Sequence, residues 1–315
     1  MLGTIEPDSI HCVVTSPPYF GLRDYGVAGQ IGLEPTPDIF VTELVDVFRE
    51  VRRVLRNDGT LWLNLGDSYS THAAGKIANP MAKSTLGGTR TQEVANESSR
   101  ASGAYYKCPS LPEKNLIGIP WRVAFALQAD GWILRQDIIW SKPNPMPESV
   151  KDRCTKAHEY LFLLTKTARY HYDAPAIAEP LERPEESERK TPIKFGGNKH
   201  VEAKKQSRLH SGNEYRGTAS GTRNKRSVWE VSTAQFSEAH FATFPPALIE
   251  PCIVAGCPDG GTVLDPFGGA GTTGLVADRL GRNAILIELN PEYARLAEWR
   301  IASDSGMFAA VEVAG

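Results

Sequence analysis

The chain has 315 residues, of which 41% are hydrophobic, enough to bury one large core and carry an inserted segment. Its formal net charge of -2 excludes a uniformly basic protein, and no stretch approaches the roughly 18 consecutive apolar residues of a membrane span. The five cysteines are scattered without a Cys-x-x-Cys pair, and the first residues lack a secretory signal. We therefore expect a cytoplasmic protein with no disulfide framework and no metal site.

The first predicted strand, residues 10–14, ends in the sequence Thr15-Ser16-Pro17-Pro18-Tyr19. Two adjacent prolines fix the backbone and lack N–H groups, so carbonyl oxygens point outward without a local donor. Ser16 adds a hydroxyl, and Tyr19 adds a flat face on which a base can stack. This turn can hold an exocyclic amino group, although two prolines can also simply end a strand while Tyr19 packs in the core.

Hydrophobic periodicity predicts the elements that follow. A strand at residues 60–65 comes after a stop signal, Asn57-Asp58-Gly59, and ends at Gly66-Asp67. Residues 69–109 lack apolar periodicity, so we expect a mobile loop that orders on binding. His158-Glu159 is expected to line the site or to satisfy backbone groups. The other predicted elements are helices at 36–56, 116–129 and 245–255 and strands at 132–140 and 160–165, with Cys252 assigned to packing.

A second glycine-rich turn follows the predicted strand at residues 262–265. Its glycines let the backbone pass close to a ligand, and the helix N-terminus behind them offers unpaired N–H groups. The next strand, residues 283–287, ends in Glu288, whose carboxylate can accept hydrogen bonds from both hydroxyls of a ribose. Asn290 is expected as the N-cap and Pro291 as the first residue of a helix. The pattern indicates a ligand that contains a nucleoside.

The Ser-Pro-Pro-Tyr turn and the run from Asp265 to Gly271 resemble the catalytic and S-adenosylmethionine motifs of the amino-group DNA methyltransferases. The catalytic motif comes first, which is the circularly permuted order of the family's beta group. The resemblance implies an α/β, Rossmann-like S-adenosylmethionine-dependent methyltransferase fold with an inserted target-recognition region. It implies Ser16, Pro17, Pro18 and Tyr19 for catalysis, and Thr15, Asp265, Pro266, Phe267, Gly268, Gly269, Gly271, Thr272, Glu288 and Asn290 for S-adenosyl-L-methionine.

The expected target-recognition region, residues 181–235, separates a catalytic half (1–180) from a cofactor half (236–315). Between Arg189 and Arg226, eleven Lys and Arg residues stand against two acidic ones. This is typical of a surface that binds the phosphates of double-stranded DNA, although a charge run can also be a solvated linker. The residues predicted to bind DNA are Lys199, Lys204, Lys205, Arg208, Arg216, Arg223, Lys225 and Arg226.

The resemblance implies methyl transfer to the exocyclic amino group of a flipped-out base stacked on Tyr19. The Pro17 carbonyl and Ser16 would accept the two amino hydrogens. Ser16, where adenine-specific members mostly carry Asp or Asn, favours N4 of cytosine over N6 of adenine. A cognate restriction endonuclease, and a monomeric or homodimeric state, are left open.

Members of the family usually begin with a strand that ends in Gly-Asp, ahead of the position of residue 10 here. We expect either upstream residues or the apolar tail at 307–313 to supply that strand. A protein that binds DNA and cofactor without turnover is therefore the alternative of another class.

Overall fold

The computed structural model describes residues 1–70, 111–181, 221–233 and 244–305. The chain separates into two compact units, one formed by Met1–Asp173 with Ser227–Gly315 and one by Ala174–Arg226. Nearly all of the expected mobile loop, most of the basic insert and the apolar tail at 307–313 lie outside the described residues. The roles given to the three sequence segments stay predictions.

The first unit is built around one sheet of seven strands. These are β1 (Ile10–Thr15), β2 (Leu55–Leu65), β3 (Ile133–Ser141), β4 (His158–Thr165), β7 (Val228–Glu230), β8 (Thr262–Asp265) and β9 (Asn283–Leu286). Their order is β7-β3-β4-β2-β1-β8-β9, and within this sheet only β4 runs in the opposite direction. The other strands therefore end at the same edge, the carboxyl edge, where β4 begins.

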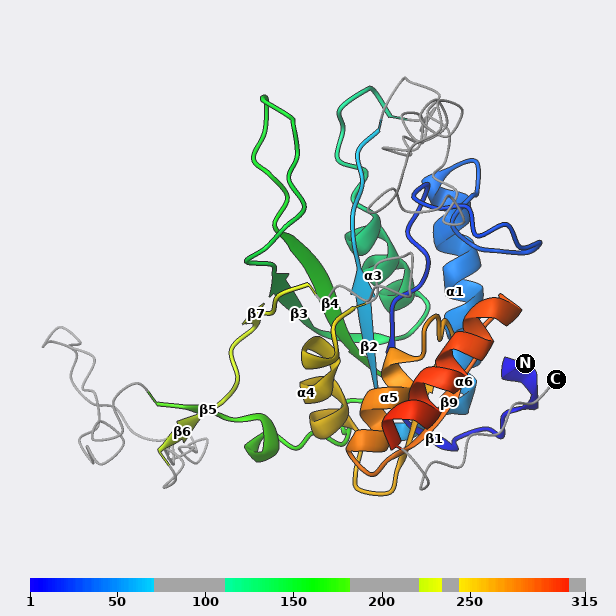
Figure 1. Ribbon diagram of the computed structural model, residues 1–315, viewed down its shortest axis with the longest axis vertical. Helices are drawn as coiled ribbons and strands as arrows, with labels where there is room; N and C mark the ends of the chain where they lie inside the picture. The colour runs from blue at the N-terminus through cyan, green and yellow to red at the C-terminus, as the bar shows by residue number, and fades with distance from the viewer. Residues whose placement is uncertain (71–110, 182–220, 234–243, 306–315) are drawn as a thin grey trace, which may run out of the picture. The chain divides into compact units, whose positions relative to one another are not determined.

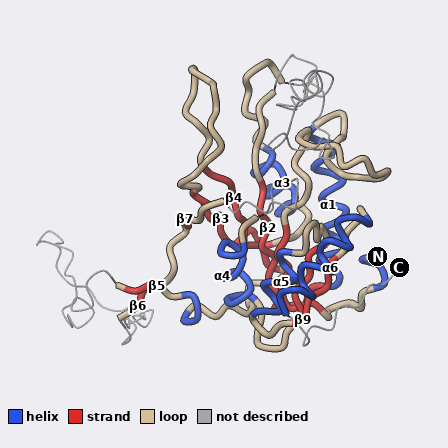
Figure 2. Tube along the Cα trace, viewed as in Figure 1, coloured by secondary structure: helices blue, strands red, loops and turns tan. Residues whose placement is uncertain are grey.

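Helices cover both faces of this sheet (Figures 1 and 2). They are α1 (Pro37–Val54), α3 (Ile119–Ala129), α4 (Pro246–Gly256), α5 (Thr272–Arg279) and α6 (Pro291–Ser305), with a 3-10 turn η1 (Leu2–Thr4). Val13 of β1 belongs to the core cluster with α1 and α3, whereas its neighbour Cys12 lies against Cys252 of α4. Cys252 is fully buried in that helix, which confirms its assignment to packing. Burial on both faces explains the nearly continuous apolar strands.

The predicted stop signal after the first long helix is wrong. β2 begins directly after α1, so Asn57-Asp58-Gly59 lies inside the strand. Leu55 is fully buried, and the ladder between β1 and β2 is irregular here, because its register shifts between the pairs Ile10–Leu55 and Cys12–Thr60. A Cβ at Gly59 would lie 2.5 Å from Leu55 Cδ1, so only glycine fits. Burial of Leu55 thus overrides the local turn signal.

The helix expected at residues 116–129 begins later, at Ile119. Gly118, with φ 79°, adopts the left-handed conformation just before α3, which breaks the chain direction there. The Asp67 carboxylate accepts hydrogen bonds from the N–H groups of Gly118 and Ile119, each at 3.0 Å. The turn after β2 therefore fixes the start of α3. The remaining predicted elements agree with the structure to within two residues at each end.

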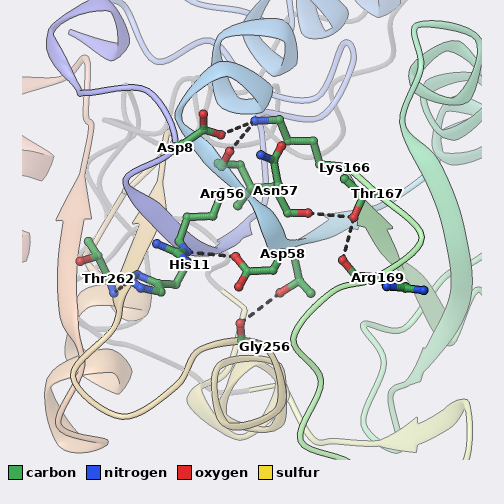
Figure 3. A network of polar contacts seen from close by, with 12 residues as sticks. Asp8, His11, Arg56, Asn57, Asp58, Lys166, Thr167, Arg169, Gly256 and Thr262 are labelled. Carbon is green, nitrogen blue, oxygen red and sulfur yellow. Dashed lines mark hydrogen bonds and ion pairs between the residues drawn. The ribbon is translucent and has the colours of Figure 1, made fainter.

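Polar contacts join the amino ends of the strands, at the edge opposite the carboxyl edge (Figure 3). His11 Nδ1 accepts a hydrogen bond of 3.0 Å from the N–H of Thr262, which connects β1 to β8. Arg56 Nε donates to Asp58 at 3.0 Å. Burial, followed by the charge of Arg56, lowers the pKa of His11, so the neutral ring that can accept this bond is favoured.

The second unit contains a 3-10 turn, η2 (Pro175–Ile177), and a two-stranded sheet of β5 (Glu179–Pro180) and β6 (Thr222–Arg223). The strands pair antiparallel. Across the described part of the chain, no helix combines the length and apolar character that crossing a membrane requires.

Candidate active site

A cavity of about 580 Å³ opens at the carboxyl edge of the sheet. Its walls come from the loops after β1, β8 and β9, from the ends of β2 and β3, and from the start of β4. The predicted site residues that line it are Ser16, Pro17, Pro18, Tyr19, Asp265, Pro266, Phe267, Gly268, Gly269, Thr272, Glu288 and Asn290. The fold thus brings the two motifs to one cavity, while Thr15 and Gly271 lie behind its wall.

Asp265 connects the two motifs directly. Its Oδ1 accepts hydrogen bonds from the Thr15 hydroxyl at 2.6 Å and from the Phe267 N–H at 3.0 Å, and its Oδ2 accepts one from the Thr273 hydroxyl at 2.7 Å. The side chain is 1% exposed. Burial raises the pKa of Asp265 to about 6, although these hydrogen bonds act in the opposite direction. Thr15, which was predicted to bind the cofactor, therefore holds the Asp265 carboxylate by a hydrogen bond.

The glycine-rich loop is closed by Glu288 from the end of β9. Glu288 Oε2 accepts a hydrogen bond of 2.7 Å from the Gly269 N–H, and Oε1 accepts one of 2.8 Å from the Asn290 N–H. Gly271 has φ 76°, and a Cβ there would lie 2.7 Å from Ala297 Cβ, so this glycine lets α6 approach the loop. Each oxygen of Glu288 keeps one further lone pair for a ligand hydroxyl.

Asn290 begins the last helix as the sequence predicts. Its Oδ1 accepts a hydrogen bond of 2.9 Å from the Glu292 N–H, and Pro291 is the first residue of α6. This confirms Asn290 as the N-cap. Its side chain also lines the cavity, so the cap and the wall are made by the same residue.

Tyr19 stands in the cavity wall with its hydroxyl bound at the sheet edge. The hydroxyl donates to Glu159 Oε2 at 2.6 Å and to Asn64 Oδ1 at 3.2 Å. The ring packs on the end of β2, where a Cβ at Gly66 would lie 2.4 Å from Tyr19 Cε2. Burial, followed by the charge of Glu159, raises the pKa of Tyr19 well above its usual value, so the hydroxyl stays protonated as a donor.

Among the residues of this wall that sequence reasoning missed are Asn64, Trp140 and Lys142. Lys142 forms an ion pair with Glu159 and lies over the Trp140 ring, 4.1 Å from its centroid. Of the pair His158-Glu159, Glu159 lines the cavity as expected, whereas His158 is exposed. A polar residue at the end of β2 and a lysine directly after β3 were the available signals, since ligands bind at such strand ends.

In the second unit, three of the basic residues predicted to bind DNA surround the Glu179 carboxylate. The nitrogens of Arg223, Lys225 and Arg226 lie 3.4, 3.8 and 3.2 Å from its oxygens. Three cations around one carboxylate leave a net positive charge, which suits phosphate. The remaining predicted DNA-binding residues, Lys199, Lys204, Lys205, Arg208 and Arg216, lie outside the described residues.

The fold and the cavity define a class of protein. It is an α/β enzyme in which the predicted nucleoside site and the turn predicted to hold an amino group share one cavity. A family model described as DNA methylase matches residues 10–299. The Type II methyltransferase M.SmaI of Serratia marcescens is 43% identical over 300 residues, covering 94% of this chain and 86% of that protein.

Two solved structures share the fold. The PvuII DNA methyltransferase (cytosine-N4-specific) has a TM-score of 0.60 at 19% identity and covers 99% of this chain and 84% of its own. A candidate DNA modification methylase from Thermus thermophilus, complexed with S-adenosyl-L-methionine, has a TM-score of 0.55 at 24% identity and covers 98% and 91%.

The chain belongs to the N6/N4 DNA methylase family. It is a DNA methyltransferase: its substrate is DNA and its methyl donor is S-adenosyl-L-methionine. These findings confirm the family, the fold and the cofactor predicted from the sequence.

Proposed function

We propose that the protein is a site-specific methyltransferase that acts on the exocyclic N4 of cytosine in a base flipped out of the duplex. The observation that carries the proposal is the shared cavity, in which Ser16 and Pro17 face the Asp265–Gly269 loop. Two further facts support cytosine: the family pattern around Ser16, and the similarity in fold to the cytosine-N4-specific PvuII enzyme. N6 of adenine is the runner-up, because Ser16 can accept a hydrogen from either amino group.

Two acceptors on the first motif explain how a weak nucleophile reacts. The lone pair of the amino nitrogen is delocalised into the base, so the nitrogen must become pyramidal before it attacks. The Pro17 carbonyl and the Ser16 hydroxyl each accept one amino hydrogen, and the Tyr19 ring stacks on the base, which favours that geometry. S-adenosyl-L-methionine would supply the methyl group to the electron pair of that nitrogen, and one amino proton would leave through Ser16 to solvent.

The side chains of the second motif fit S-adenosyl-L-methionine, which supplies an electrophilic methyl group on its sulfonium sulfur. Glu288 has one free lone pair on each oxygen for the two ribose hydroxyls, and Phe267 offers a ring beside the cavity for adenine. Asp265 Oδ2 accepts one hydrogen bond and keeps a lone pair for the cofactor's ammonium group. The negative charge of both carboxylates also favours a cationic ligand.

The wider setting follows from this activity. The Type II methyltransferases among the relatives support a restriction endonuclease of the same specificity as a partner, and action without such a partner is the alternative. Because DNA is the substrate, we infer a cytoplasmic enzyme, and either a monomer or a homodimer satisfies the chemistry. The basic residues of the 181–235 segment are assigned to the DNA backbone.

Expression in a host without DNA methylation tests the proposal. Sequencing of the genomic DNA with base-modification detection is expected to show N4-methylcytosine at one short recurring sequence. The Pro17→Ala variant, expressed at the same level, is expected to leave that sequence unmodified. Methyl groups on adenine N6 would move the substrate to the runner-up, and an unmodified genome with soluble protein present would contradict the proposal.

A further inference from the structure

The loop between β3 and β4, residues 142–157, projects beyond the carboxyl edge of the sheet (Figure 1). Its two ends are joined by the last pair of the β3–β4 ladder, Ser141 with His158. Lys142 and Glu159, which flank the loop, both line the cavity and form an ion pair. The loop therefore starts and finishes at the mouth of the site proposed to receive a base.

Met146 is the most exposed large apolar side chain of the described residues, at 86%. It stands among three prolines, Pro143, Pro145 and Pro147, each of which fixes its own φ and restricts the residue before it. Burial of such an exposed apolar side chain by a partner lowers the free energy, because apolar surface is removed from water. The prolines therefore hold Met146 in solvent, where a partner can bury it.

The sides of the loop are anchored to the body of the first unit. Arg153 pairs with Glu148 at 2.6 Å and lies over the Tyr69 ring, 4.1 Å from its centroid. Lys156 Nζ donates to the Asp67 carbonyl at 2.7 Å, next to the turn that caps α3. The contacts of Arg153 with Tyr69 and of Lys156 with Asp67 therefore hold the second half of the loop in place.

The charge of the loop suits a phosphate backbone. Its basic residues outnumber its acidic ones, and Lys151, five residues after Met146, is exposed. Apolar side chains such as Met are known to enter a duplex between base steps while basic neighbours hold the phosphates. The exposed Met146, the excess of basic residues and the nearby cavity together fit one partner, a DNA duplex from which a base has been flipped out.

We propose that Met146 enters the DNA duplex at the position that the target base vacates, and so stabilises the flipped-out state. This inference rests on the proposed function, because it requires a base in the cavity. Lys151 contacts a phosphate beside the inserted side chain. The prolines keep the backbone around Met146 stiff, and the contacts of Arg153 and Lys156 hold the loop against the segment after β2.

The test compares the normal duplex with one in which the target base faces an abasic position, so that no pair has to be broken. For Met146→Ala, kcat/KM on the normal duplex is expected to fall at least about tenfold, since unpairing and unstacking cost a few kcal/mol. On the abasic duplex the same variant is expected to return to within about twofold of the wild type. Met146→Leu keeps an apolar wedge and is expected to retain activity on both duplexes, whereas Met146→Gln is expected to behave as Met146→Ala.

Val150→Ala is the matched control, because Val150 is an exposed apolar residue of the same loop that has no proline on either side. It is expected to match the wild type. If Met146→Ala equals the wild type on the normal duplex, or stays defective on the abasic one, the wedge is overturned while the proposed function stands. A wild-type protein that binds S-adenosylmethionine but methylates neither duplex contradicts the proposed function, and this inference fails with it.

Discussion

Asp265 connects the turn that contains Ser16–Tyr19 to the glycine-rich loop at 265–271 by hydrogen bonds. It accepts hydrogen bonds from Thr15 at the end of β1 and from Phe267 and Thr273 after β8, so the position of each motif depends on the same buried carboxylate. The residues on either side of it are expected to have separable tasks. Pro17 and Tyr19 are expected to hold the base, and Asp265 is expected to hold the methyl donor.

Substitutions separate these tasks. Pro17→Ala and Tyr19→Ala are expected to lower turnover at least about a hundredfold, because a misplaced amino group no longer meets the methyl in line. Both are expected to keep cofactor affinity within about threefold, whereas Asp265→Ala should weaken it at least about tenfold through the lost charged hydrogen bond. Calorimetric titration with S-adenosylmethionine, beside single-turnover kinetics, measures both quantities. Tyr19→Phe keeps the ring as a control; equal loss of cofactor affinity in all variants would contradict the division.

The raised pKa of Asp265 predicts how cofactor affinity depends on pH. The carboxyl titrates at about 6 in the free protein, and a cationic ligand favours its ionised form, so binding below pH 6 must release a proton. Affinity is therefore expected to be constant above pH 7 and to fall, by at most about tenfold per pH unit, as pH drops below 6. Titrations between pH 5 and 8 measure this, with Asp265→Asn as the variant that cannot ionise. The same slope in Asp265→Asn would contradict the assignment.

The pairing of β1 with β8 brings the two motifs together at the carboxyl edge of the sheet. At the opposite, amino edge, His11 of β1 is hydrogen-bonded to β8. The ring accepts a hydrogen bond from the Thr262 N–H, so a proton on Nδ1 removes the bond. The pKa of His11 is lowered from 6.5 by burial and Arg56, and the unfolded state therefore takes up a proton first as pH falls. Its contribution to the free energy of unfolding is constant above pH 6.5 and decreases below it.

The change that tests this is His11→Asn, because an Asn oxygen can replace the acceptor without titrating. Urea unfolding at pH 5 to 7.5 is expected to show that the wild type loses more stability than His11→Asn below pH 6.5. The difference between the two proteins isolates His11, since Asp265, whose raised pKa acts in the opposite sense, is common to both. Parallel curves for the two proteins would contradict the role of His11.

The elements that carry the two motifs could be predicted because their signals are local. A strand that ends in two prolines, and a strand followed by glycines and a capped helix, need no knowledge of the rest of the fold. The start of β2 could not be predicted, because Leu55 joins the strand through burial against β1, far away in the sequence. Glu159 could be named as a candidate for lining the site, but its position at the carboxyl edge could not be predicted. It lies at the carboxyl edge only because β4 runs antiparallel to its neighbours, and a parallel strand would have put it at the opposite edge.

For the whole molecule, DNA affinity is expected to depend on local charge, since the net charge is only -2. Affinity for nonspecific duplex should fall steeply with salt, because each neutralised phosphate contributes about 0.9 to the slope of log K against log salt. Arg226→Gln is expected to reduce that slope by about one. Arg56→Gln, at the amino edge of the first unit, is the matched control and should leave it unchanged. An affinity independent of salt would contradict the assignment of the basic segment.

The product of the reaction tests the central claim most directly. Purified protein is incubated with unmethylated duplex DNA and S-adenosylmethionine, the DNA is digested to nucleosides, and these are identified by mass spectrometry. We expect N4-methyl-2′-deoxycytidine in amounts equal to the S-adenosylhomocysteine formed, and neither product with Pro17→Ala. N6-methyl-2′-deoxyadenosine would keep the mechanism and refute the interpretation of Ser16. A wild-type protein that binds DNA and cofactor yet leaves no methylated nucleoside would contradict the account as a whole.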